Sequence, residues 1–242
     1  MFKTTSSKLM LMFVGLNALL ILTIVSFIYL AQQQVSQKYA DEENRLTDLV
    51  STVDSLIQHY YKQQKSNQMT MEEAQKQALA AISNLRFDDQ NYFWVNDMHP
   101  KMIMHPFKPE LNGSDLSNYS DPNGKKLFVE FVDVAKSKGS GFVEYMWSKP
   151  GLQEPVEKLS YVSSFKPWGW VFGTGIYIDE LYATKKNLYM SMSIILAIII
   201  CIYLAVVYWG YKQVALPLNR LTKRMVELAD NKIEGDIPGA ER

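Results

Sequence analysis

One charged side chain stands out in a part of the chain that has the pattern of a β-strand. Lys158 lies in the segment 156–162, whose sequence is VEKLSYV. On the solvent side of a strand, a lysine would be ordinary. On a buried side its ammonium group needs an anionic partner, and a carboxylate would bind it through charge-assisted hydrogen bonds. The residues themselves leave both interpretations open, a solvated lysine or an anion-binding one.

The three histidines of the chain are far apart in sequence and lack the close paired spacing of many zinc sites. His59 lies beside the apolar face of a helical pattern, and His99 precedes a proline in a turn. His105 ends an apolar strand pattern, where it either caps the strand edge or donates to an anion. Three aspartates have the surroundings of turn-forming residues and lack EF-hand spacing: Asp97, Asp115 and Asp121. We therefore expect no catalytic constellation, no bound metal and no cofactor.

Strand alternation indicates which aromatic side chains can share a face with such an anion site. Tyr92 and Trp94 lie two residues apart and therefore point to the same side of their predicted strand. Tyr145 and Trp147 share a side in the same way, and Lys158 lies on the strand predicted next along the chain. Tyrosines at such positions are as often core residues with a solvated hydroxyl as they are ligand contacts.

Two long apolar runs without charged residues bracket this central region, at roughly 9–30 and 188–208. Each run is long enough for a helix that crosses a bilayer, which needs about 20 residues. Lys3 and Lys8 precede the first run, and a basic cluster at 212–224 follows the second. Basic residues prefer the cytoplasmic side, so we expect both ends of the chain inside and the middle outside.

The alternative for the first run is a cleaved signal peptide. The run is longer than the usual signal core of about 7–15 residues. The glutamines at 32–34 that follow it do not form a small-residue cleavage site. A retained membrane anchor is therefore the favoured interpretation.

Charge and cysteine content narrow the class of protein. The 25 basic residues balance the 25 acidic ones, so the chain lacks the basic footprint that nucleic-acid-binding proteins normally carry. Cys201 is the only cysteine and lies in the second apolar run. The middle of the chain must therefore fold on its apolar core without a disulfide, and about 150 residues are enough for that.

Helical and strand patterns divide the middle of the chain. Apolar residues at three- and four-residue steps predict a long helix that continues from the first run to about residue 68. Capping-box spacing from Thr70 to Glu73 starts a second helix, and a short amphipathic helix over 127–135 ends near Gly139. The predicted strands are 92–95, 102–104, 142–147, 155–165 and 170–178, and a last helix begins near Asp179. Helices followed by an antiparallel sheet indicate an α+β domain.

The segment 91–179 resembles the single Cache sensor domain of bacterial chemoreceptors and sensor kinases. Six motifs carry the resemblance in order: YFWVND at 92–97, MHP at 104–106, GSDL at 113–116, DPNGK at 121–125, GFVEY at 141–145 and PWGWVFGTGIY at 167–177. The resemblance implies a long N-terminal helix on a five-stranded antiparallel PAS-like sheet, with a small-molecule pocket between the sheet and its covering loops and helix. We expect the ligand-binding residues of that pocket to be Tyr92, Trp94, His105, Tyr145, Trp147, Lys158 and Tyr161.

After the second apolar run, the sequence resembles the start of a HAMP relay domain. Residues 216–221 (LPLNRL) with the apolar residues up to Ala229 resemble its first helix, and 235–238 (GDIP) resemble the start of its connector. Half of a HAMP domain cannot complete its four-helix bundle, so we interpret the chain as a fragment or the product of a truncated gene. The expected domains are 1–31, the cytoplasmic tip and first span; 32–187, the sensor; 188–210, the second span; and 211–242, the partial HAMP domain.

These features together predict a methyl-accepting chemotaxis receptor of the bacterial inner membrane, with residues 32–187 in the periplasm, and not an enzyme. Its expected partners are membrane lipid, a short organic acid or similar polar metabolite, and a second copy of the chain in a homodimer, but no nucleic acid. The resemblance implies transmission through HAMP to a chemotaxis adaptor and kinase. Two alternatives stay open: the input half of a sensor histidine kinase or cyclase, and a membrane-tethered binding protein.

Overall fold

The computed structural model describes residues 2–88 and 90–229. The chain divides into two units, Met1–Lys186 and Asn187–Arg242, and each has its own packing. The predicted HAMP connector at 235–238 lies outside the described residues.

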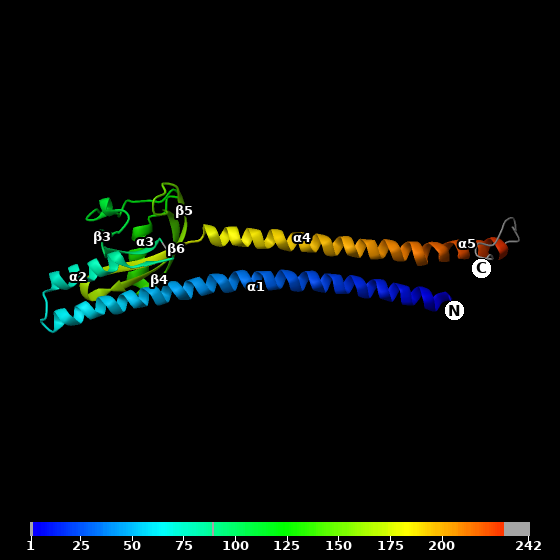
Figure 1. Ribbon diagram of the computed structural model, residues 1–242, viewed down its shortest axis with the longest axis horizontal. Coiled ribbons are helices and arrows are strands. Elements are labelled where there is room, and N and C mark those ends of the chain that lie inside the picture. The colour runs from blue at the N-terminus through cyan, green and yellow to red at the C-terminus, as the bar shows by residue number, and fades with distance from the viewer. Residues whose placement is uncertain (1, 89, 230–242) are drawn as a thin grey trace. The chain divides into compact units, whose positions relative to one another are not determined.

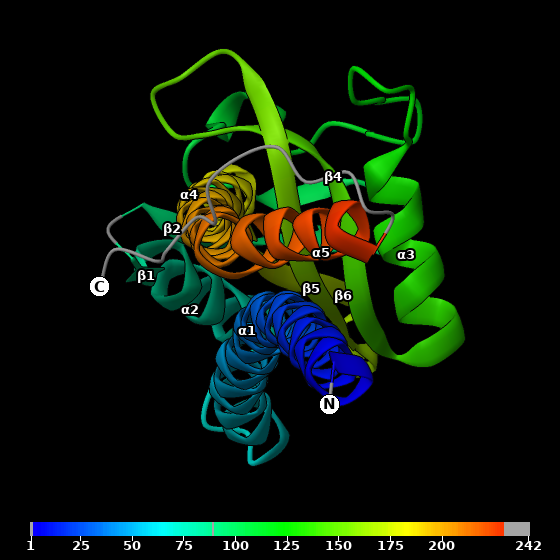
Figure 2. The ribbon, with the colours of Figure 1, turned by 90° about the vertical axis from the view of Figure 1, so that its right-hand side faces the viewer.

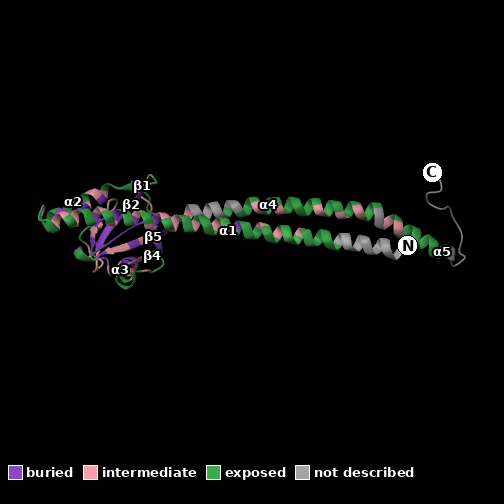
Figure 3. Ribbon diagram, turned by 90° about the horizontal axis from the view of Figure 1, so that it is seen from below, coloured by how far each residue is buried: buried purple, intermediate pink, exposed green. Residues whose placement is uncertain are grey.

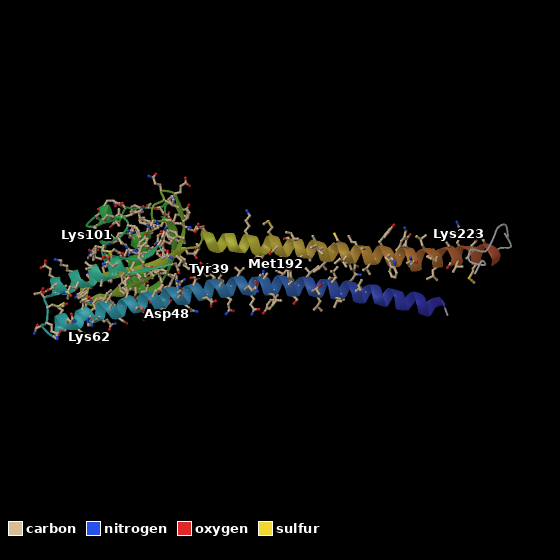
Figure 4. The ribbon with its side chains drawn as sticks, viewed as in Figure 1. Tyr39, Asp48, Lys62, Lys101, Met192 and Lys223 are labelled. Carbon is tan, nitrogen blue, oxygen red and sulfur yellow. The ribbon has the colours of Figure 1, made fainter. Side chains whose placement is uncertain are left out.

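The first unit begins with the predicted long helix. Helix α1 runs without a break over Phe2–Lys65, because no proline or further glycine interrupts it after Gly15. Its predicted apolar face is confirmed in the part that meets the rest of the unit, where four side chains are at most 1% exposed: Leu46, Val50, Val53 and Ile57. Tyr39 on the same helix (Figure 4) donates a hydrogen bond to Glu144.

Helix α2, Met71–Asn84, lies beside α1 (Figure 1) and starts as the capping pattern predicts. The Thr70 hydroxyl accepts the backbone N–H of Glu73 at 3.2 Å. Ala74, Ala78 and Ile82 are fully buried. The helix ends before Leu85, which has an extended backbone and is 36% exposed.

One antiparallel sheet forms the centre of the unit, in the order β1-β2-β6-β5-β4, with β3 paired to β2. The strands are β1 Arg86–Phe87, β2 Asn91–Asp97, β3 Met102–Met104, β4 Ser140–Ser148, β5 Pro155–Phe165 and β6 Trp170–Tyr177. Five of them are the predicted strands. The sixth, β1, has only two residues, which is too short to leave an alternation pattern in the sequence.

The two faces of the sheet are covered by different elements, as the end-on view shows (Figure 2). Helices α1 and α2 pack on one face, around a core that includes Phe93, Val95 and Phe172. Helix α3, Leu127–Lys138, covers the other face around Trp94, and it ends at Gly139 with φ +81° as predicted. Short 3₁₀ turns at Pro109–Leu111 and Lys166–Trp168 complete the loops.

Helix α4, Asp179–Gly210, follows β6 after a single residue, and α5, Leu216–Ala229, continues it. A π-helical turn at Tyr211–Ala215 joins the two helices. Pro217 has no N–H and cannot complete the regular helical hydrogen bond to the fourth residue before it. The N–H of the residue before it, Leu216, bonds to the Tyr211 carbonyl, which is five residues back rather than the four of a regular helix. This is the geometry of a π-bulge.

Among the described residues, two helical segments are long and apolar enough to cross a membrane: Val14–Lys65 and Tyr189–Glu227. The apolar stretches of both segments are mostly coloured as exposed (Figure 3), and their exposed residues include large apolar ones. Leu22 is 68% exposed and Ile202 is 60% exposed. Such exposure suits a lipid environment better than water.

Candidate functional site

Three neighbouring strands bring polar and aromatic side chains together on the face that α3 covers. Lys158 of the central strand β5 pairs in register with Tyr145 of β4 on one side and Tyr177 of β6 on the other. Because paired residues of an antiparallel sheet point to the same face, the three side chains form one row. Rings from β2, β4 and the loop after β3 join the row. We call the set the Lys158 cluster; it comprises Tyr92, His105, Tyr145, Trp147, Lys158 and Tyr177.

The ammonium group of Lys158 is the centre of the cluster. The side chain is 0% exposed, and Nζ has no hydrogen-bond partner among the residues that the structure describes. Its nearest charge-stabilising groups are aromatic faces, with ring centroids of Tyr92 at 4.2 Å and Tyr177 at 4.8 Å. Ring quadrupoles attract a cation, but they do not replace the hydrogen bonds that water would provide.

The electrostatics of Lys158 follow from this burial. Desolvation lowers the pKa of the ammonium group to about 7, and the positive charge of Lys108 lowers it in the same direction. In the part of the chain that the structure describes, no acidic side chain opposes the shift. A carboxylate at Nζ would supply both the missing hydrogen-bond acceptor and the missing negative charge.

Tyr92 and Trp147 form a fixed wall of the cluster. The indole N–H of Trp147 donates to the Tyr92 hydroxyl at 2.8 Å. Burial raises the pKa of Tyr92 well above its ordinary value, so the phenol stays neutral and its O–H remains a donor. The wall therefore offers an uncharged hydroxyl beside the cation.

Tyr145 and Tyr177 are held by neighbours on the same sheet. The Tyr145 hydroxyl shares a hydrogen bond of 3.0 Å with the Ser160 hydroxyl, and the Tyr177 hydroxyl donates to the Ser148 carbonyl at 2.9 Å. Burial raises the pKa of Tyr145 far above neutral and that of Tyr177 to about 12. Both phenols are therefore neutral at physiological pH.

His105 is 3% exposed, and its ring lies between two rings of the cluster. The centroid distances are 4.8 Å to Tyr92 and 5.7 Å to Trp147. Its Nδ1 accepts backbone N–H groups of Phe107 at 3.3 Å and Lys108 at 2.9 Å. A neutral imidazole with Nδ1 as acceptor carries its proton on Nε2. Burial, followed by the charges of Lys158 and Lys108, lowers the pKa of His105 to about 3, so the ring is a neutral donor.

Trp94 and Tyr161 differ from the other predicted residues in their placement. Trp94 lies on the same face as the cluster but at its edge, with its ring centroid 5.8 Å from Lys158 Nζ. Tyr161 lies on the opposite face, where its ring packs on Phe142 at 4.7 Å and its hydroxyl donates to Ser140 Oγ at 2.8 Å. Tyr161 is three positions after Lys158 on β5, and side chains an odd number of positions apart on a strand point to opposite faces. We leave Tyr161 out of the candidate site.

Two residues of this region were not predicted from the sequence. Tyr177 could have been found, because its place at the end of β6 aligns with Lys158 once the register is known. Lys108 could not, because it lies in a loop without periodicity. Its Nζ is 4.3 Å from the centroid of the Trp147 ring, and burial lowers its pKa against the opposing charge of Glu110.

The arrangement is suited to binding a small anion. Nothing in the cluster pairs a nucleophile with a base, and the described residues contain no group of three or more metal-ligating side chains. The predicted turn role of the aspartates is confirmed, since each carboxylate accepts backbone N–H groups of its own loop. Asp121 additionally accepts the Met146 N–H at 2.9 Å and so ties its loop to β4.

The family comparison agrees with this fold. The family described as "Cache domain" (dCache_2) matches residues 20–196. Among curated proteins, the methyl-accepting chemotaxis protein McpP of Pseudomonas putida is 36% identical over 80% of this chain and 36% of its own length. The sensor histidine kinase MctS of Rhizobium johnstonii is 35% identical over 59% of this chain and 30% of its own length. The chain thus spans about a third of the length of these relatives.

Two of the solved structures similar to this chain are described as sensor domains. A periplasmic sensor domain of a chemotaxis protein is 46% identical, with a TM-score of 0.58 over 58% of this chain and 98% of that domain. A Cache chemosensory domain studied for its carboxylic acid recognition is 44% identical, with a TM-score of 0.58 over 60% of this chain and 98% of that domain.

Proposed function

The chain belongs to the Cache domain family, and we propose that it is the input part of a bacterial chemoreceptor that binds a short carboxylate outside the cytoplasm. The similarity to a methyl-accepting chemotaxis protein supports the receptor class. The similarity to a Cache domain that recognises carboxylic acids supports the class of ligand.

The observation that carries the proposal is the buried ammonium group of Lys158. A buried cation without a hydrogen-bond acceptor costs several kcal/mol unless an anion pairs with it. The other polar groups of the cluster around it are neutral and carry an N–H or O–H: the imidazole of His105 and the hydroxyls of Tyr92 and Tyr145. Donors around one cation suit a carboxylate, which offers only acceptors.

The two apolar helical segments support the proposed topology. In this topology both ends of the chain lie in the cytoplasm and residues 32–187 lie in the periplasm, with the spans in the inner membrane. We further propose that α1 pairs with α1 of a second copy, and that residues 211–242 begin a HAMP relay. The adaptor and kinase would be reached through a cytoplasmic domain beyond this chain.

The connection between the cluster and α4 supports transmission of the binding signal. Tyr177 belongs to the cluster, and Asp179, two residues later, begins α4. Asp179 forms an ion pair with Lys149 at 2.8 Å, and Lys149 Nζ lies 5.5 Å from the centroid of the Tyr177 ring. A change at Tyr177 would therefore reach the start of α4 directly. A ligand shifts such an equilibrium only through its different affinity for the two states.

A sensor histidine kinase is the second candidate function, favoured by the similarity to MctS. The input domain would work in the same way in both classes. The gene sequence after residue 242 separates them, because a chemoreceptor continues as a long helical hairpin and a kinase continues as a catalytic core.

Calorimetry on the full chain in lipid nanodiscs tests the proposed ligand class. Short monocarboxylates are first screened by thermal shift, since a ligand at about 100 times its Kd adds about 2.7 kcal/mol of stability. Lys158→Met should then weaken the best acid roughly ten- to hundredfold, because a charge-assisted hydrogen bond contributes about 1.5–3 kcal/mol.

Methionine keeps the aliphatic bulk of Lys158, so the variant should keep its circular dichroism spectrum. Lys101→Met serves as the control, because Lys101 is exposed (labelled in Figure 4) and equally removes one positive charge. Unchanged affinity in a folded Lys158→Met protein would exclude the Lys158 cluster as the carboxylate site.

A further inference from the structure

The loop after β3 forms a tight turn over the Lys158 cluster. We call residues 105–108 the His105 turn. The imidazole Nδ1 of His105 accepts the N–H groups of Phe107 and Lys108, and the Asn112 side chain accepts the His105 N–H at 2.8 Å. These bonds fix the turn at its start, where the His105 ring lies beside the rings of Tyr92 and Trp147.

Ring contacts hold the rest of the turn on two strands at once. The Phe107 ring lies 5.0 Å from the Tyr92 ring of β2, with the Arg86 guanidinium 4.8 Å from the Phe107 centroid. Lys108 reaches the other side, where its Nζ lies 4.3 Å from the Trp147 ring of β4. The turn thus contacts both Tyr92 and Trp147 and places a second ammonium group beside the cluster.

The charges around Lys108 are mostly of one sign. Lys158 and Lys108 repel each other, and both act on His105 in the same sense. Glu110, an exposed residue, is the acidic group that acts on Lys108. Lys108 is half-buried, so burial already disfavours its charged form. An anion between the two ammonium groups would relieve both the repulsion and the lost hydration.

We propose that Lys108 is a second cationic contact for the bound carboxylate, carried to the cluster by the His105 turn, so that the ligand bridges two ammonium groups. This inference rests on the proposed function, because it needs Lys158 as the first contact. It assigns a binding role to a loop residue whose surroundings would otherwise be explained only by packing on Trp147. In this arrangement the bound anion connects Lys158 of strand β5 with Lys108 of the loop after β3.

Lys108→Met tests the inference by calorimetry on the full chain in nanodiscs, with the best short monocarboxylate from the screen as the probe. At about pH 6, where Lys158 is charged with or without Lys108, the variant should bind roughly fivefold more weakly, since Lys108 is partly solvated. Glu110→Gln should change affinity in the opposite direction, because it frees Lys108 from its acidic neighbour. Lys101→Met controls for net charge and should leave affinity unchanged.

A pH series separates an electrostatic role of Lys108 from packing alone. The field of Lys108 favours loss of the Lys158 proton, so in Lys108→Met the affinity should start to fall at a higher pH than in the wild-type protein. A residue that only shapes the turn would weaken binding without moving that midpoint.

The outcomes for the two lysines are separable. If Lys158→Met weakens binding while Lys108→Met changes neither affinity nor midpoint, the second contact is wrong and the proposed function stands. A loss of affinity in Lys108→Met without a shift of the midpoint also overturns it. If Lys158→Met itself has no effect, the proposed function fails first.

Discussion

The buried ammonium group of Lys158 should make ligand binding depend on pH. The groups that face it from β2, β4, β6 and the His105 turn are three neutral phenols, a neutral imidazole and the Lys108 ammonium. Near neutral pH, Lys158 is therefore the group at this site whose protonation changes most in the free protein.

We predict that carboxylate affinity changes little just below about pH 7 and falls by up to tenfold per pH unit above it. Below pH 7 Lys158 is protonated in both the free and the bound protein. Above it the free protein loses the proton while the complex keeps it, because the bound anion raises the pKa of Lys158. Binding must then take up a proton, which calorimetry detects as a dependence of the enthalpy on the buffer.

The Lys158→Met variant provides the reference for this measurement. If the wild-type protein binds its acid at about pH 8 without net proton uptake, Lys158 stays charged in the free protein and our account of its burial is wrong.

At the scale of single residues, sequence reasoning succeeded where strand alternation applied. Tyr92 and Trp94 lie on one face of β2, as predicted, and both rings lie near the Lys158 ammonium group. Tyr145 pairs in register with Lys158 from the neighbouring strand β4. The same rule excludes Tyr161, since an odd separation from Lys158 puts it on the opposite face. Lys108 follows no such rule, because its position depends on hydrogen bonds within a loop.

At the scale of elements, β6 carries the segment Gly173-Thr174-Gly175, in which both glycines allow close packing of β5. A Cβ atom on Gly175 would lie 2.0 Å from the Ser160 Oγ and 2.4 Å from the Leu159 carbonyl oxygen. The Ser160 hydroxyl is the hydrogen-bond partner of Tyr145. The glycine therefore positions part of the cluster without belonging to it.

Gly175→Ala should destabilise the protein by about 1–3 kcal/mol, because a Cβ atom overpacks the space between β5 and β6. Chemical denaturation of the full chain followed by circular dichroism measures the loss. Gly141→Ala is the matched control on β4, where a Cβ atom meets only a Val134 methyl group at 2.9 Å. Equal stability of the two variants would contradict the steric argument.

The helices and strands were predictable to different degrees for physical reasons. Helices α1 and α3 are each covered on one face, so apolar residues recur along them at three- and four-residue steps. Strand β2 is buried on both faces, so it appears in the sequence as a continuous apolar and aromatic run. Residues of the two-residue strand β1 and of the loop over 105–126 do not alternate regularly between a buried and an exposed side. Their sequence therefore shows no periodic pattern of apolar residues. The loop contributes His105 and Lys108, so the least predictable segment forms part of the site.

At the scale of the whole molecule, the proposed topology makes a direct prediction about accessibility. Single cysteines are placed at Ser66 and Asn219 in a Cys201→Ser background, both at exposed positions. In intact spheroplasts an impermeant thiol reagent should label residue 66 and leave residue 219 unlabelled, because the latter lies on the cytoplasmic side. Lysis should expose both. Equal labelling before lysis would exclude the model with two spans.

The distribution of aromatic rings gives the molecule optical reporters in separate regions. Of the five tryptophans, Trp94 and Trp147 lie on the site face, Trp168 and Trp170 lie in the core under α1, and Trp209 lies on α4. The indole N–H of Trp147 is bonded to Tyr92, and a lysine ammonium lies over its ring. Its emission should therefore respond to an arriving anion, while Trp168 and Trp170 record the state of the opposite core. A set of variants that each retain a single tryptophan can therefore report, without an added label, ligand arrival at one position and distant rearrangement at another.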